Sequence, residues 1–554
     1  MHENWQSVTP QYDSFAQVIS QYHELAPLTF LDVQPRLASA ISRFDKLNSL
    51  TRVLLVNAPD NAIYRQLVVD GFKQLQDSND IAAGKPVVRV ESLDSDALFG
   101  LYQAKDGDIT QHIKGYLEQA NGGYLMVSAN LILANPIMWT KLKAALLGEA
   151  VSPINADSKN LSITIPSSTF DTKLVVIGDR NQMGDLDYFD TDIQTGFCMF
   201  SEVELEVRLS EESLATYLGY VKGLLTRFQL PDITCDSVPA LLAAGARQCE
   251  DQDFAPLSPV WHNALLSESA LESNGDAVTS AHIKAAIEHK YYRESYLTLR
   301  AVDDILGGQV IIETEGEQVG QVNGLTVVEI PGHPISYGEP ARISCVIHFG
   351  DGDINDVERK AELGGNLHAK GMMIMQAFVS SALNLDEPLP YSASIVFEQS
   401  YCEVDGDSAS LAELCSLVSA LSEQPINQQI AITGAVDQFG RVQAVGGLNE
   451  KIEGFFHVCQ HKGLTGGQGV ILPKTNLKHL ALHDDVINAI KAEKFHIWSV
   501  ESVDEAVPLL TGKALRGDDE DTILNKIAQR IDDFERHIPA NGLITRLKQW
   551  FDHN

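Results

Sequence analysis

The sequence predicts a multidomain α/β protein in which a parallel-sheet domain, a helical bundle and a second α/β domain follow one another. Three observations lead to this prediction. The chain has 554 residues, and at about 100 to 200 residues per domain this length is enough for several hydrophobic cores. Short apolar runs alternate with helical stretches in the first part, and helical spacing without strands follows at residues 210–294. Beyond Gly307, strand-like runs and glycine turns return.

The amino-terminal residues 1–45 are predicted to form a short helical segment. Leu37, Ile41 and Phe44 recur at intervals of three and four, which places them on one face of a helix. Residues 46–209 carry apolar runs separated by helical stretches, a pattern typical of a parallel sheet with helices on both faces. The apolar runs are 52–57 (RVLLVN), 86–90 (PVVRV), 123–127 (GYLMV) and 173–178 (KLVVIG).

The remaining chain divides into a helical part and a second sheet-containing part. Residues 210–300 include SEESLATYLGYVKGLLTRF and TSAHIKAAIEHKYYRES, which predict a small helical bundle. Residues 308–512 contain the strand-like runs GQVNGLTVVEIPG, ARISCVIHFG and SIVFEQSY ahead of two longer helical stretches. We therefore expect a second domain of mixed strands and helices there.

The tail at residues 513–554 begins with an acidic linker, GDDED. Its apolar residues then return with helical spacing, which predicts an amphipathic helix that docks on its own chain. Binding of this helix to a partner is the alternative. The apolar residues of the tail are Ile523, Ile527, Ile531 and Phe534, with Trp550 and Phe551 near the end.

The composition excludes several classes of protein. Apolar residues make up 44% and charged residues 21%, and no run of eighteen or more apolar residues is present, which excludes a membrane protein. The net charge of −34 repels phosphates and anionic lipids, so nucleic acid is an unexpected partner. The seven cysteines lack C-x-x-C spacing, and the amino terminus lacks a basic region followed by an apolar run. These features indicate a reduced, cytoplasmic protein.

The stretch EVDGDSASLAELCSLVSAL at residues 403–421 contains a serine with two possible roles. Ser408 lies at or just before the start of a strongly helical run, where a serine commonly caps the helix. The same position presents free N–H groups and the positive end of the helix dipole to a developing oxyanion, which suits a nucleophile. This stretch alone does not decide between the two roles.

A second stretch, ITGAVDQFGRVQAVGGLNEKIEG at residues 432–454, favours the nucleophile. DGDSAS followed by TG and GGLNEK resembles the proteolytic domain of the Lon protease family, in particular the archaeal-type branch in which GDSAS replaces GPSAG. The resemblance covers about residues 308–512 and implies an α+β proteolytic fold. It identifies Ser408 as the nucleophile and Lys451 as the catalytic lysine, 43 residues apart, which is the family's usual interval.

The resemblance also implies supporting residues. Thr433 occupies the place of a threonine that hydrogen-bonds the lysine, and Asp405 the place of an acid beside the dyad that pairs with the lysine in resting states. Gly446 and Gly447 form the turn that leads into the helix of the lysine.

Serine and lysine can hydrolyse peptide bonds without a histidine. A hydroxyl is a poor nucleophile until a base removes its proton, and lysine can be that base only when it is neutral. Burial disfavours the ammonium form and lowers the pKa of a lysine, so a buried Lys451 could act near neutral pH. An exposed Lys451 would instead pair with Glu450 or Glu453. Histidines before Ser408 show no matching acid in the sequence; they are His333, His348 and His368.

Residues 30–294 resemble the AAA+ ATPase module that Lon proteases usually join to their proteolytic domain. LDVQPRLASAI at 31–41 is similar to the GQ-x-RA helix, and MWTKLKAALLGE at 138–149 to the helix after the Walker B strand. The resemblance makes residues 46–209 an AAA+-like parallel α/β sheet domain and residues 210–300 its helical lid.

The nucleotide-binding residues of such a module are replaced in this chain. A Walker A loop needs glycines that let backbone amides wrap a phosphate, and a lysine that neutralises it. After the Walker B strand, an Asp-Glu pair should hold magnesium and activate water. The residues found at these positions are Asn57, Asp60, Ala62, Ile63 and Tyr64 in the loop, and Ser128 and Ala129 after the strand.

ATP hydrolysis is therefore not expected, and peptide hydrolysis should require no cofactor. No metal site is predicted either, because DGDIND at 351–356 lacks the ligand spacing of an EF-hand loop. Arg180 and Arg247 match positions near the sensor arginines of AAA+ modules, but salt bridges would explain them equally well.

The sequence thus predicts a Lon-like serine endopeptidase that cleaves unfolded proteins or peptides with a Ser408–Lys451 dyad, without ATP hydrolysis by its degenerate module. The resemblance implies a homo-oligomeric ring, a hexamer. Two alternatives remain open. One is an ATP-dependent Lon protease with an unorthodox nucleotide site, and the other is a non-catalytic chaperone or scaffold ring.

Overall fold

The structure is a computed structural model that describes residues 1–105, 108–155, 166–350, 352–383, 391–400, 405–518 and 521–537. These residues form two compact units. The amino-terminal unit comprises Phe15–Cys235 and Pro256–Thr279, and the carboxyl-terminal unit comprises Met1–Ser14, Asp236–Ala255 and the residues from Ser280 onward. The helices of the predicted lid at 210–300 fall into both units, so the domain boundaries drawn from the sequence remain predictions.

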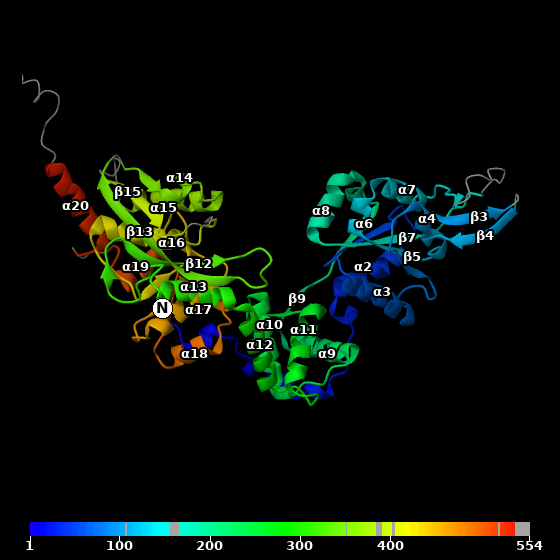
Figure 1. Cartoon of the computed structure of the whole chain (residues 1–554), viewed down its shortest axis with the longest axis horizontal. Coiled ribbons are helices and arrows are strands. Elements are labelled where there is room, and N and C mark those ends of the chain that lie inside the picture. Colours follow the sequence, from blue (N-terminus) through cyan, green and yellow to red (C-terminus); the bar gives the residue numbers. More distant parts are fainter. Residues whose placement is uncertain are drawn as a thin grey trace, which may run out of the picture. The chain divides into compact units, whose positions relative to one another are not determined.

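The amino-terminal unit contains a parallel five-stranded sheet (Figure 1). Three of the apolar runs predicted from the sequence form its inner strands, because strands covered on both faces exclude polar side chains. The run at 86–90 forms the half-buried edge strand β2. The edge strand β8 was not predicted, since only one residue of its CMFSE sequence is buried. The order is β2 (Val87–Arg89), β5 (Tyr124–Ser128), β7 (Lys173–Gly178), β1 (Val53–Asn57) and β8 (Cys198–Glu202).

Helices and a hairpin complete this unit. Helix α2 (Pro35–Lys46) buries Leu37, Ile41 and Phe44, the residues whose spacing predicted it. A three-stranded sheet in the order β4, β3, β6 was not anticipated. Its strands are β3 (Gly100–Lys105), β4 (Asp108–Lys114) and β6 (Ile154–Asn155). The other helices are α1 (Ala16–Ser20), α3 (Ala62–Asp77), α4 (Ser95–Phe99), α5 (Tyr116–Gln119), α6 (Ala129–Ala134), α7 (Pro136–Leu146), α8 (Arg180–Phe189), α9 (Glu211–Phe228) and α11 (Pro259–Glu272).

The carboxyl-terminal unit is built on a seven-stranded mixed sheet. Strand β13 pairs antiparallel with β12 and β15, whereas β14 runs parallel to β15, and β17, β20 and β21 run parallel to one another. This mixed sheet confirms the predicted α+β character of the second part. The order is β14 (Ile354–Asp356), β15 (Tyr391–Phe397), β13 (Tyr337–Phe349), β12 (Gln321–Val328), β17 (Ile430–Ile432), β20 (Gly469–Pro473) and β21 (His496–Val500).

The two faces of this sheet carry different helices (Figure 1). Side chains alternate between the faces of a strand, and on β12 Val322 packs in one core and Leu325 in the other. The core of Val322 contains α15 (Asn366–Ala382), α16 (Ser410–Ser422), α19 (Val503–Thr511) and α20 (Ile523–His537). The core of Leu325 contains α17 (Leu448–Lys462) and α18 (Asp484–Lys491).

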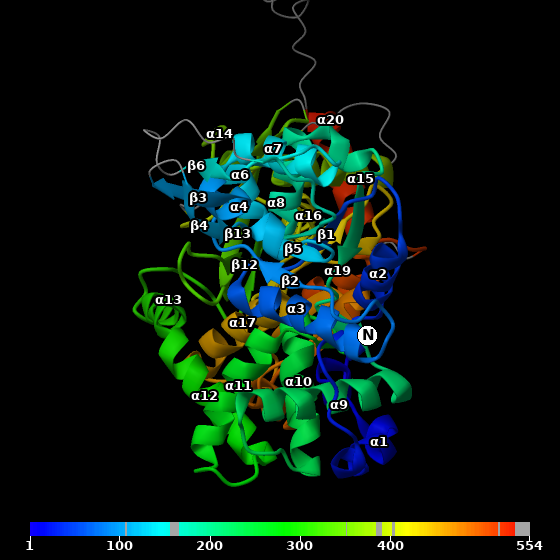
Figure 2. The ribbon, with the colours of Figure 1, turned by 90° about the vertical axis from the view of Figure 1, so that its right-hand side faces the viewer.

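Three further helices belong to the carboxyl-terminal unit and are labelled in Figure 2, and two of them, α10 and α12, pack against each other. They are α10 (Val238–Cys249), α12 (Ser280–Glu294) and α13 (Tyr296–Leu306). The short elements of the unit are α14 (Val357–Lys360), β11 (Glu317–Gln318), β16 (Ile426–Asn427), β18 (Ala435–Val436) and β19 (Val442–Gln443). Among the described residues, no helix is long and apolar enough to cross a membrane.

The carboxyl-terminal helix docks on its own chain, as its spacing predicted. Ile523, Ile527 and Ile531 of α20 are buried in the same core as α16. Arg530 of α20 donates hydrogen bonds of 2.8 and 2.9 Å to carbonyls in the last turn of α16, where a helix leaves its carbonyls unpaired. The side chain of Phe534 and the residues Trp550 and Phe551 lie outside the described part.

The first residues of the chain do not form the predicted helix. The N–H of Glu3 donates to the carbonyl of Ile497 at 2.8 Å, so this segment lies along the edge strand β21. Val8 is fully buried in the core of α17 and α18. Pairing with a distant strand satisfies the backbone here, which helical spacing alone could not reveal.

Candidate active site

Ser408 lies just before α16, and its carbonyl ties it to the end of β17. That carbonyl accepts hydrogen bonds from the N–H of Gly434 at 2.9 Å and from the hydroxyl of Thr433 at 3.2 Å. The cap of α16 is Ala409, which has no capping side chain. Ser408 therefore does not take the capping role, and its half-buried hydroxyl is available for another contact.

That contact is with Lys451 in the first turn of α17. The Lys451 Nζ lies 3.1 Å from the Ser408 Oγ and 3.4 Å from the Thr433 Oγ1. Gly447 caps α17 with φ 65°, a left-handed conformation that favours glycine. Because α16 and α17 cover opposite faces of the sheet, residues from both helices can meet only beyond the end of a strand. Thr433, the residue after β17, occupies that position between them.

The surroundings of Lys451 favour its neutral form. Its side chain is buried, with 3% exposed, and desolvation lowers its pKa to about 8, although the charges of Asp407 and Glu450 act in the opposite direction. A pKa of about 8 leaves about a tenth of the lysine neutral at pH 7. A neutral amine 3.1 Å from a serine hydroxyl can accept its proton.

The structure does not bring Asp405 to the lysine. Its Oδ1 accepts a hydrogen bond of 3.2 Å from the N–H of Leu367 in the first turn of α15. Within the described chain, no hydrogen bond or ion pair joins Asp405 to Lys451, and the acid that acts on the charge of Lys451 from this loop is Asp407. Asp405 thus satisfies a free amide at a helix start, which spacing alone could not distinguish from pairing with the lysine. Glu403 lies outside the described residues.

His368, a buried histidine in the first turn of α15, lies near two acids that the sequence did not reveal. The His368 Nε2 lies 3.1 Å from an oxygen of Asp356, and its Nδ1 lies 3.6 Å from an oxygen of Glu413. Burial raises the pKa of Glu413 to about 7, and the charge of His368 opposes this shift. The three residues come from separate elements of the fold, so no sequence spacing signals them. Ser408 bonds to Lys451 rather than to a histidine.

The would-be phosphate site of the amino-terminal unit is occupied by the chain itself. Asn61 accepts hydrogen bonds of 3.0 and 3.1 Å from two amides in the first turn of α3, the amides that a phosphate would use. Asp60 pairs with Arg65 and accepts a hydrogen bond of 2.5 Å from the Ser128 hydroxyl. The Asp60 side chain is 3% exposed, so a carboxylate fills the place of an anion. These residues do not fit a bound nucleotide phosphate.

The other replaced positions also lack phosphate or magnesium ligands. Asn57 donates a hydrogen bond of 2.9 Å to Glu202, and Glu202 also forms an ion pair with Arg180 at 2.7 Å. Tyr64 is buried and packs edge-on against Phe30. Ala62 begins α3, Ile63 is exposed, and Ala129 is buried at the start of α6.

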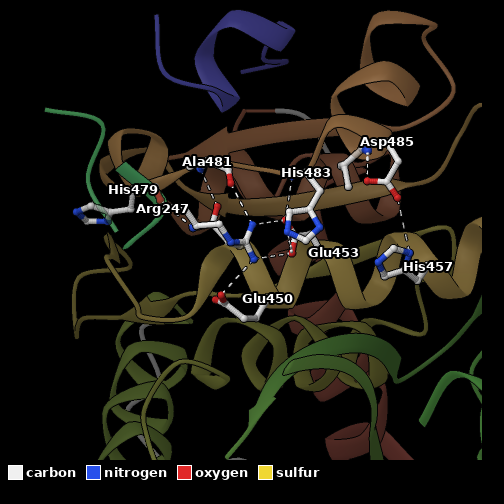
Figure 3. Close-up of polar contacts among 10 residues, drawn as sticks. Arg247, Glu450, Glu453, His457, His479, Ala481, His483 and Asp485 are labelled. Atoms are coloured by element: carbon white, nitrogen blue, oxygen red, sulfur yellow. Dashed lines mark hydrogen bonds and ion pairs between the residues drawn. The ribbon is translucent and has the colours of Figure 1, made fainter. Parts of the chain in front are cut away.

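Arg247, the second arginine near a sensor position, lies in the last turn of α10 and pairs with α17 (Figure 3). Its Nη1 is 2.6 Å and its Nη2 2.8 Å from the two oxygens of Glu453. Of the two explanations that the sequence left open, the structure shows a salt bridge, and its partner is on the helix of the catalytic lysine candidate.

Comparisons with known proteins agree with a chain made of an AAA-like part followed by a proteolytic part. A family model described as a LonB-like AAA domain matches residues 83–204, and one described as the Lon protease (S16) C-terminal proteolytic domain matches residues 392–511. A Lon protease homolog of Escherichia coli is 40% identical over 557 residues, which cover 95% of this chain and 94% of that protein. A Lon protease homolog of Haemophilus influenzae is 36% identical over 558 residues, covering 94% and 90%. The archaeal Lon protease of Methanocaldococcus jannaschii is 28% identical over 44% of this chain and 36% of its own.

Proposed function

Because the chain belongs to the Lon protease family, we propose that it is a serine endopeptidase that cleaves unfolded proteins or peptides with Ser408 as nucleophile and Lys451 as base. The observation that carries this proposal is the distance of 3.1 Å between the Ser408 Oγ and the buried Lys451 Nζ. Proteases of this family act on protein substrates. Family resemblance further supports a homo-oligomeric ring, a hexamer, around the sites.

The proposed reaction proceeds through an acyl-enzyme. Neutral Lys451 accepts the hydroxyl proton while the Ser408 oxygen attacks the peptide carbonyl carbon, and backbone N–H groups near Ser408 stabilise the oxyanion. Collapse of the tetrahedral intermediate breaks the C–N bond, and the leaving amine takes the proton from Lys451. Water then attacks the ester with Lys451 again as base, which releases the acid and restores the Ser408 hydroxyl. Thr433, 3.4 Å from the Lys451 Nζ, orients the amine.

The test of this proposal is cleavage of fluorescent casein by the purified chain with and without Mg-ATP. We expect equal cleavage in both conditions and none by Ser408→Ala, because only Ser408 can form the acyl-enzyme. Ser381→Ala, an exposed serine near the end of α15, is the matched control and should cleave like the unmodified chain. Cleavage that requires ATP would favour the ATP-dependent alternative, and a folded chain that cleaves nothing would favour the scaffold.

We also propose that the amino-terminal unit does not use ATP. The side chains of Asp60 and Asn61, which occupy the place of a phosphate at the start of α3, support this proposal. The Asp60 carboxylate would repel a phosphate, and Asn61 already binds the amides that a phosphate needs.

Mg-ATP should therefore leave the thermal unfolding of the chain unchanged. A ligand present at a hundred times its Kd would stabilise the folded state by about 2.7 kcal/mol, a shift that differential scanning fluorimetry resolves easily. Mg-ADP and magnesium alone serve as the controls. A melting temperature that rises steadily with ATP concentration, beyond the effect of magnesium alone, would contradict the proposal.

A further inference from the structure

Arg247 joins three separate parts of the carboxyl-terminal unit (Figure 3). Both of its terminal nitrogens bind Glu453 of α17, in a two-pronged contact that matches the planar fork of the guanidinium. The Nη1 also donates to the carbonyl of Ala481 at 3.1 Å, and the Nη2 lies 3.5 Å from an oxygen of Glu450. One side chain of α10 therefore holds α17 and the segment that precedes α18.

The contact between Arg247 and Glu453 is largely buried, and both oxygens of Glu453 accept hydrogen bonds. The side chain of Glu453 is 8% exposed and that of Arg247 28%. Glu453 also accepts a hydrogen bond of 3.0 Å from the N–H of His483. Burial alone would raise the pKa of Glu453, but the charge of Arg247, reinforced by His483, holds it at about 2. A buried carboxylate with three donors keeps a single orientation.

This contact lies next to Lys451 on α17. Glu450 and Glu453 flank Lys451 in the sequence, and Glu450 favours the charged form of the lysine. Arg247 faces both glutamates and offsets their charge. The contact also fixes the first two turns of α17, and the distance of 3.1 Å between Lys451 and Ser408 depends on where those turns lie.

We infer that Arg247 is a positioning residue for the dyad, which anchors the start of α17 through Glu453 and screens Lys451 from the carboxylate of Glu450. The inference rests on the proposed function of Ser408 and Lys451. In this chain, the arginine near a sensor position acts on the proteolytic site through an ion pair within the same unit.

Several other titratable groups face this region and must remain unchanged in the test. Around Lys451 the group is Asp407 before α16, and β13, which packs on α17, adds Glu339. Around Arg247 they are Glu250, Tyr291, His457, His483 and Asp485, and α13, which packs on α17, adds Asp303 and Asp304.

The experiment follows the titration of Lys451 in the full chain by NMR of ¹³Cε-labelled lysine, with the resonance assigned by its loss in Lys451→Arg. We expect a midpoint near pH 8 in the unmodified chain. In Arg247→Met, the uncompensated carboxylate of Glu450 should raise the midpoint by about half a pH unit or more, and adding Glu450→Gln should lower it again. Arg36→Met, an exposed arginine of α2 that pairs with Glu204, is the matched control and should leave it unchanged.

A second readout separates position from charge. The rate at which a small fluorophosphonate modifies Ser408, followed by intact mass, should fall at pH 8 in Arg247→Met. Arg247→Lys keeps the charge but loses the two-pronged contact, so its titration midpoint should stay near that of the unmodified chain while the rate falls.

The outcomes distinguish this inference from the proposed function. If Arg247→Met only lowers the melting temperature, with midpoint and rate unchanged in the folded fraction, the inference is wrong. If the unmodified chain cleaves no casein but its Lys451 midpoint moves in Arg247→Met, the proposed function fails, and only the effect of Arg247 on the charge of Lys451 stands. Should Arg247→Met not fold, Glu450→Gln alone must lower the midpoint, and an unchanged midpoint would overturn the inference.

Discussion

Lys451→Met is expected to slow the acylation of Ser408 by about 100- to 10,000-fold at pH 8, the usual range for loss of a general base. Methionine matches the length of lysine and suits the buried site, so the chain should remain folded. In the unmodified chain, the rate should rise with pH through a midpoint of about 8, since only neutral Lys451 can take the proton. The variant should lose this step in the profile.

The measurement is the rate of fluorophosphonate labelling from pH 6 to 10, with Lys494→Met as the matched control. Lys494 is exposed, and its replacement should leave both rate and midpoint unchanged. A Lys451→Met chain that labels as fast as the unmodified one would exclude Lys451 as the base.

The same substitution should alter stability in a way that depends on pH. The pKa of Lys451 falls from 10.5 to about 8 on folding, so between these values the unfolded chain binds more protons and the stability of the unmodified chain rises with pH. Below pH 8 both states are protonated, and the buried ammonium costs about 3 kcal/mol. Lys451→Met should therefore be more stable by urea unfolding below pH 8, with an advantage that shrinks toward pH 10.5.

Gly454→Val is the second substitution with a large expected effect, because α17 rests directly on the backbone of β13. A Cβ on Gly454 would lie 1.9 Å from the carbonyl oxygen of Gly338, and one on Gly338 would lie 2.1 Å from that of Glu450. No side chain fits at these distances, so either the fold loses about 4 kcal/mol or more, or α17 moves away from β13. A displacement of about 1 Å at Lys451 would slow the reaction about 100-fold even in a folded chain.

Urea unfolding and the labelling rate of the folded fraction measure the two effects. Gly184→Ala is the matched control, because Gly184 also lies within a helix, α8, and a Cβ there meets no atom. It should be neutral or gain about 0.5 to 1 kcal/mol from its helix preference. Equal stability and labelling in Gly454→Val and the unmodified chain would show that α17 does not need this close contact.

The features that the sequence predicted correctly are local. The apolar runs of β1, β5 and β7 reflect strands buried on both faces, and the spacing of Ile523, Ile527 and Ile531 reflects one buried helical face. The edge strand β8 and the pairing of Glu3 with Ile497 were missed, since β8 buries only one residue and a pairing between distant residues leaves no local pattern.

The residues of the candidate site likewise fall into those that the sequence indicated and those that only the structure revealed. The resemblance of the motifs to the Lon family pointed to Ser408, Lys451 and Thr433, which the structure brings within hydrogen-bonding distance of one another. It also suggested Asp405, whose carboxylate instead binds an amide at the start of α15. The acids around His368, with Asp356 3.1 Å away, come from segments with no shared motif and were not found.

By itself, the sequence predicted the order of the α/β parts, the residues proposed as the dyad and the replacement of the phosphate-binding residues, because each depends on a short stretch of chain. Only the tertiary structure decided how charges are paired: Arg247 with Glu453, Asp60 with Arg65, and Asp407 rather than Asp405 toward Lys451. The burial that lowers the pKa of Lys451 was decided there too. The physical reason is that both pairing and desolvation depend on distances between residues far apart in the chain, which no local pattern encodes.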